Sequence, residues 1–77
     1  MIVVREILSE RLRLCRKEAG LTQIQVAIYC DITEQAYQNY ERMTREPRLE
    51  ILIRLADLFH VSLDYLTGRT DQRAVNQ

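Results

Sequence analysis

Amide side chains are concentrated in one short stretch of the chain, residues 33–42, which reads TEQAYQNYER. Gln35, Gln38 and Asn39 each carry both a hydrogen-bond donor and an acceptor. Base edges in the major groove of DNA offer the same mixture, whereas a row of lysines would only grip phosphate. The stretch therefore favours readout of a nucleic acid, and the alternative reading is an ordinary polar surface.

Basic residues lie on either side of this stretch. The formal net charge of the 77 residues is zero, which by itself counts against nucleic-acid binding because phosphates attract positive charge. The distribution is uneven, however: residues 1–20 carry five basic and three acidic groups, and residues 21–41 carry no Lys or Arg. Residues 42–48 then carry Arg42, Arg45 and Arg48 against Glu46. Positive charge is thus available on either side of residues 21–41, the segment that contains most of the amide side chains.

Metal binding and catalysis find little support in the sequence. Cys15 and Cys30 each lie within an apolar helical pattern and are expected to be small buried residues rather than a disulfide or a metal site. With His60 as the one histidine, they cannot assemble a zinc set. No Ser-His-Asp set, paired catalytic carboxylates or phosphate loop is recognisable. We therefore expect no enzyme, no cofactor, no metal and no small-molecule substrate.

The N-terminal segment MIVVREIL is apolar but short, and Arg5 and Glu6 interrupt it. It fits neither a signal peptide nor a membrane span. We expect a cytoplasmic protein without membrane contact.

Helical periodicity runs through the chain, and two glycines and one proline are few breakers. The fold class predicted is all-α. A first helix is expected over residues 4–19 and a fourth over 49–59, with Gly20 and Gly68 as C-terminal caps and Thr22, Thr33 and Ser62 as N-terminal caps. The inward residues expected on the first helix are Val4, Leu8, Leu12, Cys15 and Ala19, and those on the fourth are Leu49, Leu52, Leu55, Ala56 and Phe59.

Residues 21–41 predict two short helices joined by a tight turn at Asp31-Ile32. Gln25 stands three residues after Thr22 and completes a capping-box pattern. The inward residues expected in this pair are Val26, Ala27 and Cys30, followed by Ala36, Tyr37 and Tyr40. This is the layout of a helix-turn-helix, in which the second helix enters the major groove.

The chain resembles the Cro and phage-repressor type of helix-turn-helix regulators, also called the xenobiotic-response-element family. The matching segments are RLRLCRKEAGLTQ, Ala27, YERMTREP and LEILIRLADLFHVSLDYLTGR, so that the resemblance covers roughly residues 8–69. It implies a five-helix lambda-repressor-like DNA-binding domain over residues 8–67, in which helices two and three form the reading unit. Residues 1–7 would extend helix one, and residues 68–77 would form a flexible tail.

The resemblance also implies roles for individual residues. Gln23 would bond a phosphate and brace the reading helix, and Arg16 and Glu41 would form a structural ion pair between helices one and three. The groove-facing positions would be Thr33, Glu34, Gln35 and Gln38, and the backbone-contacting positions Asn39, Arg42, Arg45 and Arg48.

Four positions depart from the family pattern. The family usually has glycine where this chain has Asp31, Met43 and His60, and a side chain there costs backbone strain. Glu34 departs in charge: it could accept a hydrogen bond from the amine of cytosine, or simply stabilise the helix start.

Self-association is expected as well, because one helix-turn-helix reads only a few base pairs and a two-fold dimer reads two half-sites. The apolar residues expected outside the core are Ile2, Val3, Ile7, Leu14, Ile24, Ile28 and Ile51. The function predicted is a sequence-specific transcriptional regulator of the repressor type that acts as a homodimer on double-stranded DNA. The alternative is a protein-interaction module such as an antitoxin or antirepressor.

Overall fold

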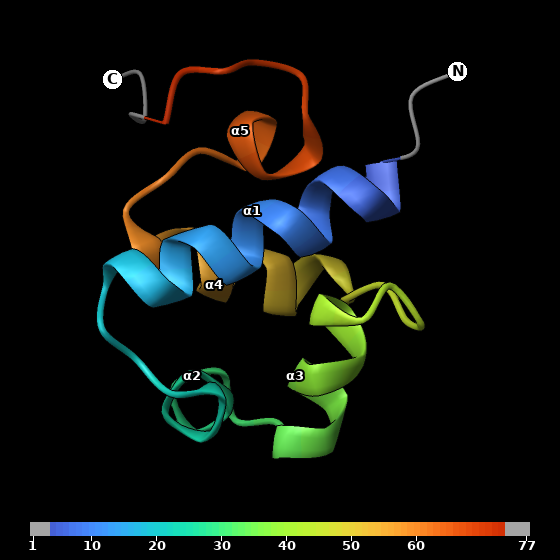
Figure 1. The fold of residues 1–77 in the computed structure, drawn as a ribbon, viewed down its shortest axis with the longest axis vertical. Helices are drawn as coiled ribbons and strands as arrows, with labels where there is room; N and C mark the ends of the chain where they lie inside the picture. Colours follow the sequence, from blue (N-terminus) through green and yellow to red (C-terminus); the bar gives the residue numbers. More distant parts are fainter. Residues whose placement is uncertain (1–3, 74–77) are drawn as a thin grey trace.

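Five α-helices make up the fold in the computed structural model, which describes residues 4–73 (Figure 1). They are α1 (Val4–Glu18), α2 (Gln23–Cys30), α3 (Glu34–Glu41), α4 (Leu49–Phe59) and α5 (Leu63–Thr67), and no strand occurs within the described range. Helix α1 crosses the middle of the molecule in front of α4. Helix α5 lies on one side of α1, and α2 and α3 lie on the other. The all-α, five-helix prediction is confirmed.

Hydroxyl side chains begin three of the helices, as the sequence predicts. The Thr22 hydroxyl accepts a hydrogen bond from the Gln25 backbone N–H, and the Gln25 side chain accepts one from the Thr22 N–H, which completes the capping box. Thr33 and Ser62 cap α3 and α5 by the same kind of bond from the N–H three residues on. These bonds satisfy donors that a helix start leaves free.

Left-handed residues end the helices, and three of them are not glycine. Gly20 and Gly68 have φ values of 71° and 85°, whereas Asp31, Met43 and His60 have φ values of 58°, 66° and 56°. A Cβ is strained in this conformation, by roughly 1–2 kcal/mol per residue. The three departures from the glycine pattern therefore fall at positions where the backbone itself favours glycine.

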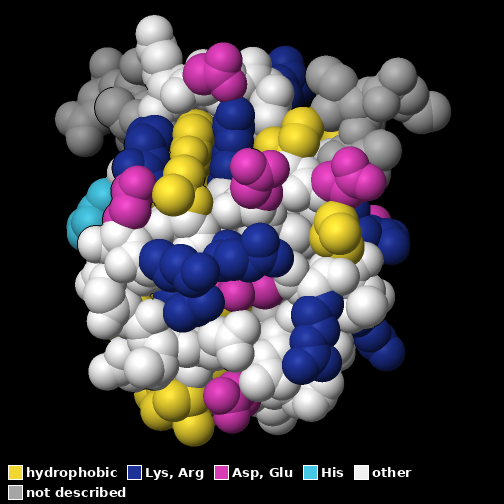
Figure 2. All heavy atoms as spheres, in the orientation of Figure 1, with side chains coloured by type: hydrophobic (Ala, Val, Ile, Leu, Met, Phe, Trp, Pro, Cys, Tyr) yellow, Lys and Arg dark blue, Asp and Glu magenta, His cyan; other side chains and the backbone are white. Residues whose placement is uncertain are grey.

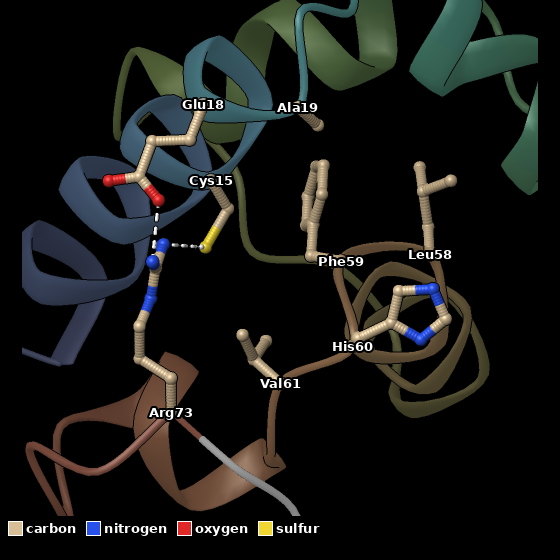
Figure 3. A pocket seen from close by; sticks show the side chains of 8 residues that line it. All are labelled: Cys15, Glu18, Ala19, Leu58, Phe59, His60, Val61 and Arg73. Carbon is tan, nitrogen blue, oxygen red and sulfur yellow. Dashed lines mark hydrogen bonds and ion pairs between the residues drawn. The ribbon is translucent and has the colours of Figure 1, made fainter.

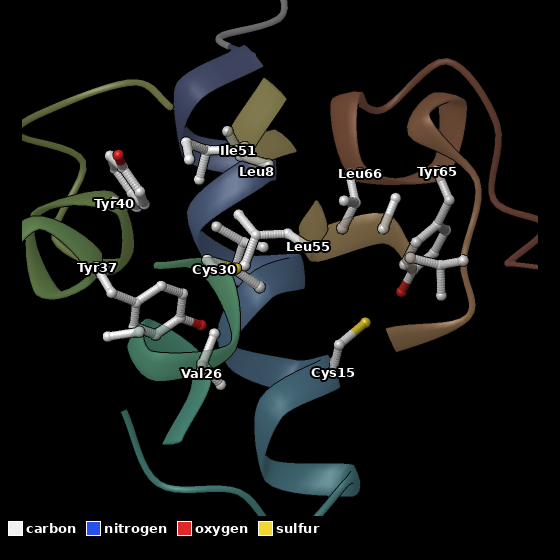
Figure 4. Close-up of a cluster of buried hydrophobic side chains, with 14 residues drawn as sticks. Leu8, Cys15, Val26, Cys30, Tyr37, Tyr40, Ile51, Leu55, Tyr65 and Leu66 are labelled. Atoms are coloured by element: carbon white, nitrogen blue, oxygen red, sulfur yellow. The ribbon is translucent and has the colours of Figure 1, made fainter. Parts of the chain in front are cut away.

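The core lies between α1, α4 and the α2–α3 pair, with α5 closing one side (Figure 4). Leu8, Leu12 and Cys15 contribute the buried face of α1, but Val4 and Ala19 are exposed, so the expected stripe is too long at both ends. The fully buried side chains of largest volume are Tyr37, Leu12, Leu55, Leu66, Val26 and Cys30.

Helix α4 is rotated relative to the prediction. Leu55 and Ala56 are buried as expected, but Leu49 is 66% exposed, and Ile51, which we placed on the surface, is 2% exposed. Glu50, Arg54 and Asp57 form a polar ridge on this helix, and Leu49 and Ile51 lie at its two borders, where periodicity alone does not decide which residue is buried. Packing against α1, α2 and α5 makes that selection. The exposure expected for Leu14, Ile24 and Ile28 is confirmed, whereas Ile7 is half-buried; Ile2 and Val3 lie outside the described residues.

The segment that follows α5 lies against α1. The Arg73 guanidinium pairs with Glu18 at 2.5 Å and donates to the Cys15 Sγ at 3.3 Å (Figure 3). Arg11 and Arg73 stand 4.2 and 5.5 Å from the centre of the Tyr65 ring. Residues 69–73, which the sequence places in a tail, thus contact the domain. Of the helices between residues 4 and 73, none has the length and apolarity to cross a membrane.

Candidate nucleic-acid interface

Helices α2 and α3 form a compact pair joined by a tight turn (Figure 1). The Asp31 N–H donates to the Ile28 carbonyl at 3.1 Å, and the Ile32 N–H donates to the Ala27 carbonyl at 3.0 Å. Val26 and Tyr37 are fully buried in this region. The turn and the buried side chains fix α3 against α2, so that its opposite face is left to solvent.

The outward face of α3 carries the residues expected to read DNA. Glu34 and Gln35 are exposed, and Gln38 and Asn39 are half-buried. The Gln35 amide donates to the Asn39 side-chain oxygen at 3.3 Å. Thr33 is exposed at the start of the helix, and because its oxygen only accepts the capping bond, its O–H proton remains available as a donor.

A second group of the expected residues forms a network beneath this face. Arg16 donates through Nε and Nη2 to the two oxygens of Glu41, at 2.7 and 3.2 Å. The Gln23 amide donates to Glu41 Oε1 at 3.2 Å and accepts from the Gln38 amide at 3.4 Å. The sequence missed Arg13, which donates to the Glu41 carbonyl at 2.9 Å. Gln38 is thus linked through Gln23 to the ion pair.

Glu41 is 5% exposed, yet its surroundings favour the ionised form. Burial alone would raise the pKa of this carboxyl, but the hydrogen bonds from Arg16 and Gln23 and the charge of Arg16 outweigh burial and lower it. Burial, together with the neighbouring carboxylate, raises the pKa of Tyr37. The pair is therefore a charged structural link rather than a proton donor near neutral pH.

Unpaired cations concentrate beside α3. The chain has 11 Lys and Arg residues. Within residues 4–73, seven of them pair with a carboxylate or donate to a carbonyl, namely Arg5, Arg11, Arg13, Arg16, Arg54, Arg69 and Arg73. The side chains of Lys17, Arg42, Arg45 and Arg48 have no such partner in that range, and three of these four follow α3 directly. A chain of zero net charge thus keeps three free guanidinium groups next to its amide-bearing helix.

A groove runs between α3 and the start of α4. It brings together five of the expected site residues, namely Thr33, Gln35, Asn39, Arg45 and Arg48. Ala36, Tyr40 and Glu46 complete its lining. The sequence predicts Tyr40 as a core residue. The apolar pattern cannot separate a fully enclosed ring from one that also borders a surface groove, as Tyr40 does. Glu34, Arg42 and the Gln23–Gln38 network lie outside this groove.

Charged and apolar side chains gather on different parts of the surface shown in Figure 2. Lys and Arg side chains gather over α1 and over the region of α3, and a hydrophobic patch lies over α2. Ile24, Ile28 and Tyr29, all on α2, are 49%, 71% and 54% exposed. The exposed apolar side chains of α2 therefore lie on a different element from the arginines that follow α3.

Comparison with known proteins agrees with this architecture. A helix-turn-helix family model matches residues 12–66. The HTH-type transcriptional regulator ImmR of Bacillus subtilis is 37% identical over 70 residues, which are 91% of this chain and 55% of ImmR. The cryptic phage CTXphi transcriptional repressor RstR of Vibrio cholerae is 37% identical over 62 residues, 80% of this chain and 55% of RstR. The chain spans about half the length of these curated relatives.

Solved structures share the fold. A transcriptional regulator from Listeria innocua superimposes with a TM-score of 0.77 at 34% identity, over 91% of this chain and 64% of that one. The hypothetical transcription factor NHTF from Neisseria gives 0.78 at 23% identity, over 84% and 75%. The family match contains α2, α3 and α4 in full, which are the helices that build the candidate interface. The chain belongs to the helix-turn-helix family of which the Cro and phage-repressor regulators are members.

Proposed function

We propose that this protein binds double-stranded DNA as a transcriptional regulator of the repressor type, with α3 in the major groove. The observation that carries the proposal is the set of three free guanidinium groups, Arg42, Arg45 and Arg48, beside the exposed amide face of α3. Relatives named as transcriptional regulators and as a phage repressor support it. They favour it over a protein-interaction module.

Base readout falls to the exposed part of α3. The major groove is about 12 Å wide and admits a helix. Among residues 4–73, the Gln35 amide is held only by Asn39, so it can exchange this bond for a base edge. Glu34 can accept from the amine of cytosine, and Thr33 can donate through its hydroxyl. Gln38 is held by Gln23, which fixes its side chain in one orientation before DNA arrives.

Phosphate contacts frame the reading helix. Arg42, Arg45 and Arg48 are exposed and free to pair with the DNA backbone. Gln23 and Asn39 can add neutral hydrogen bonds from the two ends of the site. Contacts of this kind set register and affinity without reading sequence. The zero net charge is then no obstacle, because the charge that matters is local.

A homodimer is part of the proposal. A single helix-turn-helix contacts too few base pairs to select a site, and a two-fold pair places two reading helices one turn of DNA apart. Exposed apolar side chains on α1 and α2, among them Leu14, Ile24 and Ile28, are available for such contact. Helix α3 must stay outside the dimer interface, and the protein would work in the cytoplasm.

Selection from a random pool of duplex DNA tests this function. The proposal expects an enriched motif with two-fold symmetry, and expects Gln35→Ala to change the preference at particular base pairs. Failure to enrich any sequence, with the protein folded, would contradict sequence-specific binding. Sedimentation of the free protein gives its stoichiometry independently.

A further inference from the structure

Helix α2 carries no charged residue and exposes apolar side chains to solvent. Its sequence is QIQVAIYC, and its inner face is buried in the core through Val26 and Cys30. Its outer side bears Ile24, Ile28 and Tyr29, here called the α2 patch, which are 49%, 71% and 54% exposed. A helix that is apolar on both sides is normally covered on both sides. The α2 patch is thus a surface suited to contact with another protein.

The α2 patch lies apart from the surface that we assign to DNA. The groove between α3 and α4 is lined by Gln35, Arg45 and other residues that follow α2, and no member of the patch lines it. In Figure 2 the hydrophobic surface over α2 lies at the lower edge of the molecule, below the Lys and Arg side chains. A protein that holds DNA with α3 and its flanking arginines therefore keeps the α2 patch open at one edge, within reach of a neighbour on the same duplex.

The size of the α2 patch indicates a contact between molecules that are already held close together. A stable interface buries roughly 800 Å² on each partner. A large aromatic side chain buries at most about 250 Å², so that three partly exposed side chains fall well short of a stable free complex. On one DNA duplex, however, neighbouring proteins meet at a high effective concentration, and a weak contact is enough to favour adjacent binding.

The charge of α2 indicates which molecule the neighbour is. Charged groups steer unlike partners toward each other, and α2 has none to offer for such steering. Two copies of α2 can instead meet without repulsion between like charges, and each supplies the apolar surface that covers the other. When the two helices pair antiparallel, Asp31 at the end of each helix faces the positive end of the other. A second copy of this chain therefore fits the α2 patch.

We propose that copies of this protein bound at neighbouring positions on one DNA duplex contact each other through Ile24, Ile28 and Tyr29, and that they bind cooperatively for this reason. The inference rests on the proposed function and adds a protein–protein surface to it. It assigns the α2 patch to contacts between bound neighbours, and leaves the dimer of the free protein to other exposed apolar side chains, such as Leu14 on α1.

Binding to mixed-sequence duplexes of two lengths tests the proposal. A short duplex holds one binding unit and measures DNA binding alone, whereas a duplex several times longer lets units bind side by side. We expect the wild type to bind next to an occupied position about tenfold more tightly than at an isolated one, equivalent to about 1.4 kcal/mol. Ile28→Gln changes no charge and keeps a good helix former. It should abolish this gain and leave the affinity for the short duplex unchanged.

Ile53→Gln is the matched control, because Ile53 is a 42% exposed isoleucine on α4, and it should retain the wild-type cooperativity. Equal cooperativity of Ile28→Gln and the wild type, or a wild type that binds the long duplex without cooperativity, would overturn the α2 contact and leave the proposed function intact. Absence of binding to either duplex would overturn both. Sedimentation of the free proteins adds a second readout: if Ile28→Gln dissociated a dimer that the wild type forms, the patch would be the dimer interface and the proposal would be wrong.

Discussion

The Arg16 guanidinium on α1 meets the Glu41 carboxylate at the end of α3 through two hydrogen bonds, at 2.7 and 3.2 Å. Arg16 also donates to the Leu21 carbonyl, just before α2, at 3.1 Å. One side chain therefore ties together the three helices whose arrangement sets the angle of α3. Because Gln23 and Gln38 join the same carboxylate network, the ion pair links stability of the fold to geometry of the reading face.

Removal of the Glu41 carboxylate should destabilise the domain. Arg16 is 14% exposed and would lose its buried partner, so Glu41→Ala should lower the free energy of unfolding by roughly 3 kcal/mol, the low end of the range for a broken buried pair. Chemical denaturation measures this change. Glu46→Ala is the control: its pair with Arg5 is largely exposed and should contribute about 1 kcal/mol or less. Equal midpoints for Glu41→Ala and the wild type would refute the structural role.

The same pair should make the domain sensitive to acid. Since the folded state lowers the pKa of Glu41 from its ordinary value of 4.5, its stabilisation is complete above that value and is lost as the pH falls through the folded pKa. The wild type should therefore lose more stability than Glu41→Gln between neutral and strongly acidic pH. Melts of both proteins across this window give the difference. A constant difference at every pH would contradict a depressed pKa.

Local features of this fold could be predicted from the sequence, and long-range ones could not. Thr22, Thr33 and Ser62 accept hydrogen bonds from backbone N–H groups three residues away, so the adjacent sequence is enough to predict their capping roles. Which face of α4 is buried depends on packing against other helices, and there the prediction for Leu49 and Ile51 was wrong.

The candidate site divides in the same way. The resemblance pointed to the amides and arginines of the site, but not to which of them are already engaged. Only the folded chain shows that Gln38 is tied to Gln23, that Arg13 reaches the Glu41 carbonyl and that Tyr40 borders the groove. The first two contacts join residues 15 and 28 positions apart, for which the sequence carries no periodic pattern.

Substitutions on the two parts of the interface should have different effects on binding. Gln35→Ala should cost on the order of 1–3 kcal/mol at the base pair that it reads and little elsewhere. Arg45→Ala should weaken binding to all DNA sequences alike. It should also reduce the slope of log binding constant against log salt concentration by about 0.9 in magnitude. Arg69→Ala, which removes an exposed arginine near α5, should change neither. Competition assays with single-base operator variants separate these outcomes, and identical sequence-independent losses for Gln35→Ala and Arg45→Ala would show that the reading face is misassigned.

Relief of backbone strain should stabilise the chain at Met43. Its φ of 66° is unfavourable for a residue with a Cβ, and its side chain is 43% exposed, so that little burial is lost on truncation. Met43→Gly should raise the free energy of unfolding by about 0.5–1 kcal/mol. This is the strain energy that the substitution relieves, reduced by the conformational entropy that glycine adds to the unfolded chain. Urea denaturation measures it. Thr44→Gly, at a position without positive φ, should be destabilising, and a lower midpoint for Met43→Gly would show that strain is not significant there.

Binding of the purified protein to a mixed-sequence DNA duplex, measured over a range of salt concentrations, tests the central claim most directly. Three free arginines predict a log–log slope of about −3 for each bound subunit and about −5 for a dimer, at about −0.9 per neutralised phosphate. The account predicts tight binding at low salt that weakens along this slope. Absence of binding at low salt, or affinity independent of salt, would contradict the claim that α3 and its flanking arginines form a DNA-binding surface.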